Sequence, residues 1–421
     1  MIWAVCLQMT CDNDRPEANI DKAKLLVERA MIELEERTAA SSSASRAPVL
    51  VLLPELMAAG YSFTTRGTWE ASESIKEKEE AEQEFQRGGG GEGLTQTFLR
   101  EMALKYSIYI GTTLVEFDPK DEHYYNTFLM YGPPEGRRWG MVRKSTPASF
   151  EAFFFRPEGD ADREDGLRPH VIETPIGRIG VSICYENFLC QYVLPALSNT
   201  FPAYKQQSTV QHLSTLELDL LLMPFSCPVP EISSPAFLSS ILPPTKNDVA
   251  TFHRHVQIVG SKVASILRVP TLYCNKTGKW KTTAPFLPVK LTRSFPGEST
   301  ICDSNGAILA KASSSKEQFI IASLPLPSSC SSSASKRKEQ DEKYRKWMTK
   351  EDRYLFDFTP FFHYVWLISE WLGSLCYELA RANKRKHRQT EDDVWWRIVS
   401  FASFYAVGSF LLVLCFHRLL S

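Results

Sequence analysis

The chain has 421 residues, with 48 Lys and Arg against 49 Asp and Glu and a formal net charge of −1. This balance excludes a protein whose main task is to coat nucleic acid, because phosphate binding requires a surplus of Lys and Arg on one face. The length and the 43% hydrophobic content suffice for one large α/β domain with appendages.

Short β-branched runs alternate with longer amphipathic segments from the N-terminus to about residue 324. The first run, MIWAVCLQMT, has no basic region followed by a long apolar stretch, so we interpret it as a buried strand and not as a secretory signal. The pattern predicts helices at residues 18–37 and 94–106, and strands at residues 3–8, 49–53, 109–116, 127–131, 178–183, 218–223 and 271–275. This order predicts an α/β fold with strand-helix units around a common sheet.

Three stretches interrupt the order, at residues 39–47, 71–93 and 197–214. The second contains GGGGEG, which we interpret as a surface loop and not as a phosphate-binding loop, because no Lys followed by Ser or Thr comes after it. The ten cysteines form no CxxC pair and no regular spacing. We therefore expect neither a zinc cluster nor a disulfide framework, and the pattern favours a reducing compartment such as the cytosol.

The composition changes at the end of the main domain, which we place at residues 1–326. Residues 327–352 are rich in Ser and Lys and cannot bury apolar surface, so we predict a polar linker there. Residues 353–394 predict an amphipathic helical segment, with an interfacial helix at residues 361–380 favoured over a second membrane span because Glu370 and Glu378 are costly at mid-bilayer. Its basic cluster ARANKRKHR suits anionic headgroups, and a nuclear import signal is the competing interpretation.

Residues 395–421 predict a transmembrane helix. The nineteen residues 398–416 carry no formal charge, and Trp395 and Trp396 stand at one edge, where indole rings favour the membrane interface. A buried core helix is the alternative. The sequence thus predicts a domain on the cytosolic side of a membrane, held by one C-terminal span, with the organelle left open.

Three short segments place a reactive side chain directly after an apolar strand, where catalytic groups of α/β proteins are displayed. They are VLVLLPELMAAGY around Glu55, WGMVRKSTPASFEAF around Lys144 and GRIGVSICYENF around Cys184. Each residue alone is more often a core thiol or a surface charge. Together they form a chemically complete set, because a thiol nucleophile needs a proton acceptor and its acyl adduct needs a cation or N–H groups at the oxyanion.

These segments resemble the three signature blocks of the nitrilase superfamily of carbon-nitrogen hydrolases: a PEL block, an RK block and a GxxIC(Y/W)E block. The resemblance extends to LDLLLMPFSCP, VPTLYCNKTG and SFPGESTICDSNGAILA, and so covers roughly residues 1–325. It implies a four-layer α-β-β-α sandwich for the carbon-nitrogen hydrolase domain at residues 1–326. It also implies dimers or higher homo-oligomers.

The resemblance implies a role for each matching residue. Cys184 is the nucleophile that forms a thioester, Glu55 is the general base, and Lys144 stabilises the tetrahedral oxyanion. The backbone N–H of Tyr185 is a second oxyanion donor, and Glu151 matches the additional glutamate that positions the lysine. Tyr61 either lines the pocket or packs in the core. No metal or organic cofactor is expected, and the histidines of the triplet at residues 253–255 are interpreted as surface residues.

Two reactions fit these residues best. The first is hydrolysis of a small amide or carbamoyl compound by water. The second is nitrilase activity, which takes a nitrile to an acid and ammonia. Acyl transfer to an amine and a membrane-recruited scaffold without turnover remain as further alternatives, although a scaffold has no need of a complete catalytic set.

Overall fold

The computed structural model describes residues 1–39, 47–62, 68–76, 92–148, 151–158, 170–187, 209–229, 246–283 and 290–325. The predicted linker, amphipathic segment and transmembrane helix (327–352, 353–394 and 395–421) lie outside these residues, as do the larger parts of the three interrupting stretches. In the part of the chain that the structure describes, no helix combines the length and the apolar character needed to cross a membrane.

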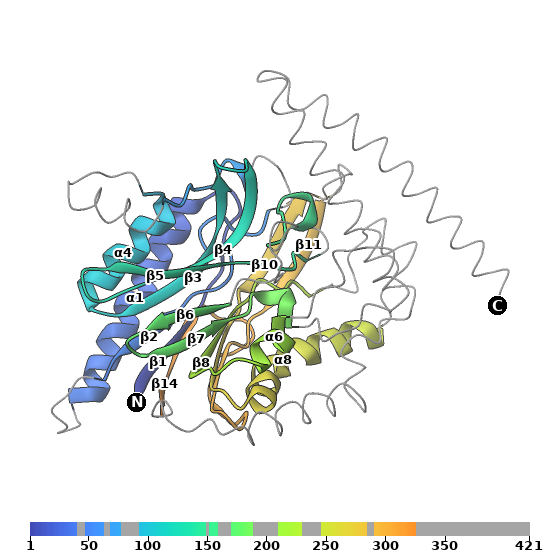
Figure 1. The fold of residues 1–421 in the computed structure, drawn as a ribbon. Coiled ribbons are helices and arrows are strands. Elements are labelled where there is room, and N and C mark those ends of the chain that lie inside the picture. The colour runs from blue at the N-terminus through green and yellow to red at the C-terminus, as the bar shows by residue number, and fades with distance from the viewer. Residues whose placement is uncertain are drawn as a thin grey trace, which may run out of the picture.

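Two six-stranded sheets form the centre of the fold (Figure 1). The first runs in the order β14 (Gln318–Leu324), β1 (Ile2–Gln8), β2 (Val49–Leu52), β3 (Tyr109–Asp118), β4 (His123–Gly132), β5 (Arg137–Arg143). The second runs in the order β13 (Ile308–Lys311), β12 (Thr300–Cys302), β9 (Thr271–Cys274), β8 (Leu220–Pro224), β7 (Gly177–Val181), β6 (Val171–Thr174). Strands β10 (Thr277–Thr283) and β11 (Lys290–Pro296) form a separate hairpin. The predicted common sheet is therefore two sheets, each with a parallel centre.

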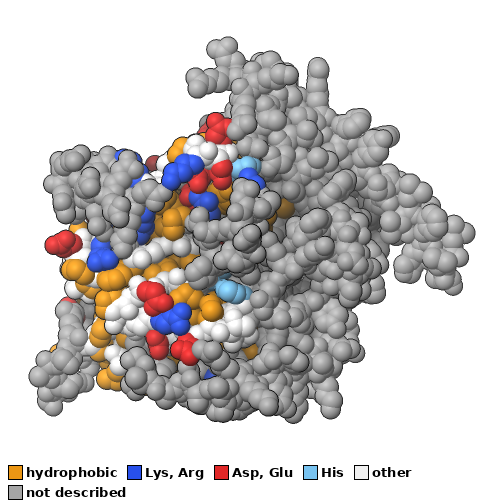
Figure 2. Space-filling model, viewed as in Figure 1, with side chains coloured by type: hydrophobic (Ala, Val, Ile, Leu, Met, Phe, Trp, Pro, Cys, Tyr) orange, Lys and Arg blue, Asp and Glu red, His pale blue; other side chains and the backbone are white. Residues whose placement is uncertain are grey.

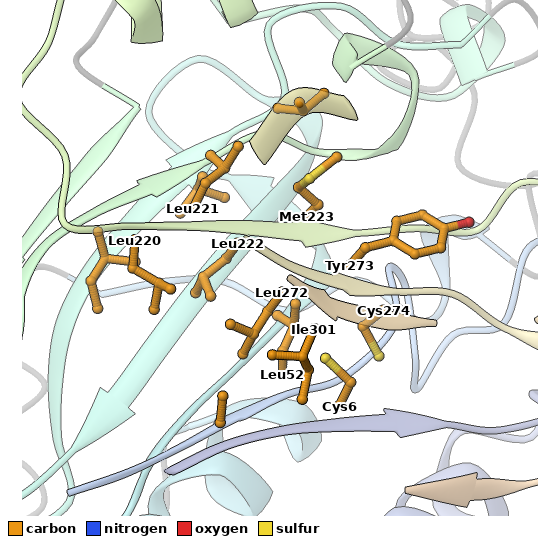
Figure 3. Close-up of a cluster of buried hydrophobic side chains, with 14 of the residues drawn as sticks. Cys6, Leu52, Leu220, Leu221, Leu222, Met223, Leu272, Tyr273, Cys274 and Ile301 are labelled. Atoms are coloured by element: carbon orange, nitrogen blue, oxygen red, sulfur yellow. The ribbon is translucent and has the colours of Figure 1, made fainter. Parts of the chain in front are cut away.

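The main core lies between the two sheets (Figure 3). Cys6 and Leu52 of the first sheet lie in one cluster with Leu222, Leu272 and Ile301 of the second, and all five are fully buried. Burying one such aliphatic side chain contributes about 1.5–3 kcal/mol. This core holds the strand ends of both sheets in a defined position relative to one another.

A second core lies between the first sheet and its helices. In β2, Leu52 faces the core between the sheets, while its neighbour Val51 faces the helical layer, as the alternation of side chains along a strand requires. The continuous apolar run VLVLL follows from burial of this strand on both faces.

Helices cover the outer faces of both sheets. Helices α1 (Pro16–Ala39) and α4 (Leu94–Tyr106) cover the first sheet, and α8 (Lys246–Leu267) and the short α6 (Thr209–Ser214) lie on the second (Figure 1). The buried residues of α1 recur at helical spacing. The layers are thus α-β-β-α, as expected from the resemblance. On the described surface shown in Figure 2, acidic and basic side chains are intermixed.

Candidate active site

The three predicted segments converge where strand ends of the two sheets meet. Glu55 follows β2 and Lys144 follows β5 of the first sheet, while Cys184 follows β7 of the second. The Lys144 Nζ lies 2.7 Å from Glu55 Oε1 and 2.6 Å from Glu151 Oε2, and all three side chains are 0–1% exposed. The structure therefore brings two carboxylates and one ammonium into direct contact inside the protein.

Hydrogen bonds from neighbouring segments hold both the backbone and the side chain of Glu55. Its backbone N–H donates to the Phe225 carbonyl at 3.3 Å, and Asn126 Nδ2 donates to Glu55 Oε1 at 2.8 Å. The next residue, Leu56, has a positive φ of 47° and donates its N–H to Thr113 Oγ1 at 2.7 Å. Within the described residues, Glu55 Oε2 is buried and accepts no hydrogen bond. One oxygen is therefore fixed by Lys144 and Asn126, and the other is open to a proton.

Glu151 lies in the 3-10 helix η1 (Glu151–Phe153) and orients Lys144 from the opposite side. Its Oε2 also accepts the Ala148 N–H at 2.8 Å, and its Oε1 accepts the Tyr61 hydroxyl at 3.0 Å. Tyr61 thus contacts this charged group through Glu151 and also packs against aromatic residues. An ammonium has three N–H donors, and two of those on Lys144 are used by the carboxylates.

The charges of this group depend on one another. Burial disfavours the charged form of Lys144, but the carboxylates of Glu151 and Glu55 outweigh it and hold the lysine pKa above its ordinary value. Burial raises the pKa of Glu151 to about 7, against the effect of Lys144 and with a further rise from the Glu55 charge. One ammonium between two buried carboxylates leaves a net negative charge, which explains why the group binds a proton near neutrality.

Cys184 opens the 3-10 helix η2 (Cys184–Asn187) with a positive φ of 47°, and it is 3% exposed. A non-glycine residue in the left-handed region is strained and needs support from its surroundings. That support comes from Asn187, whose Nδ2 donates to the Ser182 and Cys184 carbonyls at 2.9 and 3.1 Å. Tyr185 lies in the same turn and is half-buried.

Glu186 connects the cysteine segment to the lysine segment. Its two oxygens accept the N–H groups of Ile183 and Ser145, each at 2.6 Å. Burial raises the pKa of Glu186 to about 7, with those backbone donors opposing the rise. This buried bridge fixes the distance between Cys184 and Lys144.

The Cys184 thiol is protonated in this environment. Burial raises its pKa well above the ordinary value, and a hydrogen-bonding contact with the Cys227 thiol and the Glu55 charge raise it further, while Lys144 lowers it. A thiol is a weak nucleophile, so reaction at Cys184 requires a base that removes the proton during attack. The open oxygen of Glu55 is the available candidate.

Sequence reasoning missed several members of this site. Glu186 and Asn187 stand in the CYEN segment and Cys227 stands in LDLLLMPFSCP after β8, so these three could have been found there, whereas Asn126 in β4 carries no local signal. The interpretation of the histidine triplet as a surface feature is wrong for His255, which is buried. Among the described residues, no group of three or more His, Cys, Asp or Glu side chains is arranged to hold a metal ion.

Comparison of the sequence with known proteins gives matches over just under half of the chain. A sequence model described as carbon-nitrogen hydrolase matches residues 4–199. The nitrilase of Pyrococcus abyssi is 30% identical over 190 residues, which are 45% of this chain and 57% of that protein. The omega-amidase NIT3 of Saccharomyces cerevisiae is 27% identical over 191 residues, 44% of this chain and 55% of that protein. The matches thus span about half the length of these relatives.

Solved structures match over more of the chain. A carbon-nitrogen hydrolase from Helicobacter pylori aligns with a TM-score of 0.53 at 18% identity, over 87% of this chain and 98% of that one. Saccharomyces cerevisiae Nit3, a member of branch 10 of the nitrilase superfamily, aligns with a TM-score of 0.51 at 19% identity, over 84% and 96%. At these identities the likeness is one of fold.

Proposed function

The chain belongs to the nitrilase superfamily of carbon-nitrogen hydrolases, and we propose that it hydrolyses a non-peptide amide or carbamoyl compound through a thioester on Cys184. The observation that carries this proposal is the buried contact of Lys144 with Glu55 and Glu151, beside a thiol held in a strained turn. Such a group supplies a nucleophile, a base and an oxyanion cation within one water-poor region.

The first half of the reaction forms the acyl-enzyme. Glu55 takes the Cys184 proton on its open Oε2 as the sulfur attacks the substrate carbonyl carbon. The oxyanion that forms is stabilised by the third N–H of Lys144 and the backbone N–H of Tyr185. When the tetrahedral intermediate collapses, the carbon-nitrogen bond breaks, and Glu55 returns the proton to the departing amine or ammonia.

The second half regenerates the thiol. Glu55 takes a proton from water as the water oxygen attacks the thioester, and the same two donors stabilise the second oxyanion. Collapse releases the acid, and the proton on Glu55 returns to the Cys184 sulfur. Glu151 contributes by holding Lys144, and Tyr61 by holding Glu151. Neither residue takes part in bond making.

Nitrile hydrolysis is the second candidate, because the relatives include both the nitrilase of Pyrococcus abyssi and the omega-amidase of Saccharomyces cerevisiae. Acyl transfer to an amine remains a third possibility and is separated from hydrolysis by product analysis with and without added amine. The homo-oligomeric state stays a prediction.

The test is mass spectrometry of the intact chain during incubation with small amides, carbamoyl compounds and nitriles, while released ammonia is followed. We expect an acyl adduct on Cys184 together with ammonia, and neither in Cys184→Ala. The free energy of unfolding of Cys184→Ala should stay within about 1–2 kcal/mol of that of the unchanged chain, because the side chain is small. Ammonia release by Cys184→Ala at the rate of the unchanged chain would contradict the proposal.

We further propose, from the sequence alone, that residues 395–421 anchor the chain in a membrane with the catalytic domain in the cytosol. A chain that ends before residue 398 should leave the membrane fraction and keep its ammonia release. Retention of the shortened chain in the membrane fraction would contradict the anchor.

A further inference from the structure

A second thiol lies beside the candidate nucleophile. Cys184 follows β7 and Cys227 follows β8, and these strands are parallel neighbours in the second sheet, with Val181 paired to Leu222. The contact continues past the end of β7, because the Ser182 N–H donates to the Leu222 carbonyl at 3.0 Å. Adjacent strands lie about 4.8 Å apart, and a disulfide joins Cα atoms that are about 4.4–6.8 Å apart. The spacing of the two strands therefore suits a disulfide between the segments that follow them.

Hydrogen bonds on two sides fix the segment that carries Cys227. The Phe225 N–H donates to the Cys274 carbonyl at 2.8 Å, and the Phe225 carbonyl accepts the Glu55 N–H at 3.3 Å. The Cys227 N–H donates to Asn275 Oδ1 at 3.3 Å. Cys227 is 7% exposed, so its thiol is buried in the same part of the protein as Glu55.

The side chains of the two cysteines meet on one side of the second sheet. Burial raises the pKa of the Cys184 thiol most, and a hydrogen-bonding contact with the Cys227 thiol raises it further. The Tyr273 ring lies 4.7 Å from that of Phe225, and its hydroxyl accepts a hydrogen bond from Asn275 Nδ2 at 3.0 Å. Burial raises the pKa of Tyr273, and Cys227 and then Cys184 raise it further. Both sulfurs therefore lie near the same phenol.

Another thiol pair shows what is special about the first. Cys6 and Cys274 lie between the two sheets with their sulfurs directed toward one another, and both are fully buried (Figure 3). Their neighbours in this core include aliphatic side chains such as Leu52. Cys184 instead lies beside Glu55, which has an open buried oxygen. The Cys184 pair thus combines a second thiol with a base that can activate the first.

We propose that Cys227 is the resolving thiol of Cys184, so that a peroxide converts the two cysteines into a disulfide that reversibly inactivates the site. The inference goes beyond the proposed function, because it assigns a modification and not a substrate. An oxidised cysteine that finds no second thiol proceeds to sulfinic or sulfonic acid, which thiols do not reduce. A disulfide protects the nucleophile from this fate, because exchange with an external thiol restores it.

The chemistry has two steps. In the first, Glu55 Oε2 takes the Cys184 proton as the sulfur attacks one oxygen of hydrogen peroxide. The oxygen-oxygen bond breaks, the second oxygen leaves as water with that proton, and Cys184 becomes a sulfenic acid. In the second step, the Cys227 sulfur attacks the Cys184 sulfur and the sulfur-oxygen bond breaks. The hydroxide leaves as water with the Cys227 proton, so that the thiols are oxidised by two electrons and the peroxide is reduced to water.

The test is peptide mapping of the full chain after exposure to hydrogen peroxide, with free thiols blocked and disulfides left intact. We expect linked peptides that contain Cys184 and Cys227, and an intact mass lower by two hydrogen atoms, both reversed by dithiothreitol. Cys6 and Cys274 should stay reduced. A link from Cys184 to another cysteine of the sequence, such as Cys190, would overturn the proposal. Conversion of Cys184 to sulfinic acid without any link in the unchanged chain would overturn it as well.

Cys227→Ser removes the resolving thiol and keeps a side chain of similar size. After the same exposure we expect sulfinic or sulfonic acid on Cys184, and at least about tenfold less free Cys184 recovered by dithiothreitol than in the unchanged chain. The matched control is Cys11→Ser, which removes a half-buried thiol and should leave the Cys184–Cys227 link unchanged. Equal recovery in Cys227→Ser and the unchanged chain, both shown to be folded by thermal melting, would overturn the proposal. Cys227→Ala replaces Cys227→Ser if the latter does not fold.

Peptide mapping separates this inference from the proposed function. The oxidation needs a peroxide and no amide or nitrile, so the map decides on the resolving thiol even if no substrate gives Cys184-dependent ammonia. A mapped Cys184–Cys227 link without turnover supports the thiol pair while the proposed function fails. Ammonia release by a chain that forms no such link supports the proposed function and overturns the resolving thiol.

Discussion

Replacing Lys144 by Met removes a cation in direct contact with the two buried carboxylates Glu55 and Glu151. In the structure the ammonium lies 2.7 Å from Glu55 and 2.6 Å from Glu151, with the side chains 0–1% exposed. Removal of one partner of a buried ion pair costs about 3–5 kcal/mol, because the remaining charge has neither water nor a counter-ion. We therefore expect Lys144→Met to lower the free energy of unfolding by about 3–5 kcal/mol near neutral pH and to abolish ammonia release.

The effect has a defined dependence on pH. Without Lys144, the pKa of Glu151, which burial and the Glu55 charge raise, loses the lowering effect of the ammonium and rises further above its value in the unfolded chain. A carboxyl whose pKa is raised by folding stabilises the folded chain at low pH and loses this contribution as pH rises. The destabilisation by Lys144→Met should thus be larger at about pH 8 than at about pH 5.

Urea unfolding followed by tryptophan fluorescence measures this difference. A second substitution, Glu151→Gln in the Lys144→Met background, should recover part of the loss because it removes one of the unpaired charges. The matched control is Lys24→Met, which breaks an exposed pair with Glu101 at 3.0 Å, with side chains 37% and 50% exposed. It should cost less than about 1 kcal/mol. Equal losses in the two variants, or a loss for Lys144→Met that is independent of pH, would refute the reasoning.

Three further outcomes follow from the geometry. Because burial holds the pKa of Glu151 at about 7 despite Lys144, we expect the kcat/KM of the unchanged chain to rise with pH through about 7. Glu151→Gln should lower kcat/KM and move this rise to lower pH in a pH-rate profile. Tyr61→Phe removes the 3.0 Å hydrogen bond to Glu151 and should lower kcat/KM about tenfold in steady-state assays, with circular dichroism unchanged. Gly111→Ala should lower the unfolding free energy by about 1–3 kcal/mol in urea, because the added Cβ would lie 2.4 Å from Phe128 Cζ; an unchanged midpoint would contradict this close contact.

The sequence by itself determined the main elements and the candidate catalytic residues. The predicted strand at 49–53 and the helix at 94–106 correspond to β2 and α4, because their apolar residues recur with the period of one conformation. Glu55, Lys144 and Cys184 were found because each directly follows an apolar strand in a segment that resembles a family signature. Both signals depend only on residues close together in the sequence, so they can be recognised without knowledge of the tertiary structure.

The strands with weaker patterns were missed. β13 has mostly exposed residues, and the β10–β11 hairpin alternates polar and apolar residues without a turn motif that indicates its position. The pattern of residues also could not predict the division into two sheets, because parallel strands buried on both faces have the same apolar composition in either sheet.

Only the tertiary structure decided which polar residues join the site. Asn126 lies 71 positions from Glu55, and Lys276 lies 220 positions from Leu56, yet each pair shares a hydrogen bond. In the sequence Lys276 is an ordinary lysine after a strand, and nothing there indicates that it is fully buried. Strand register and the packing of the two sheets bring these side chains together, and both are set by contacts between residues far apart in the chain.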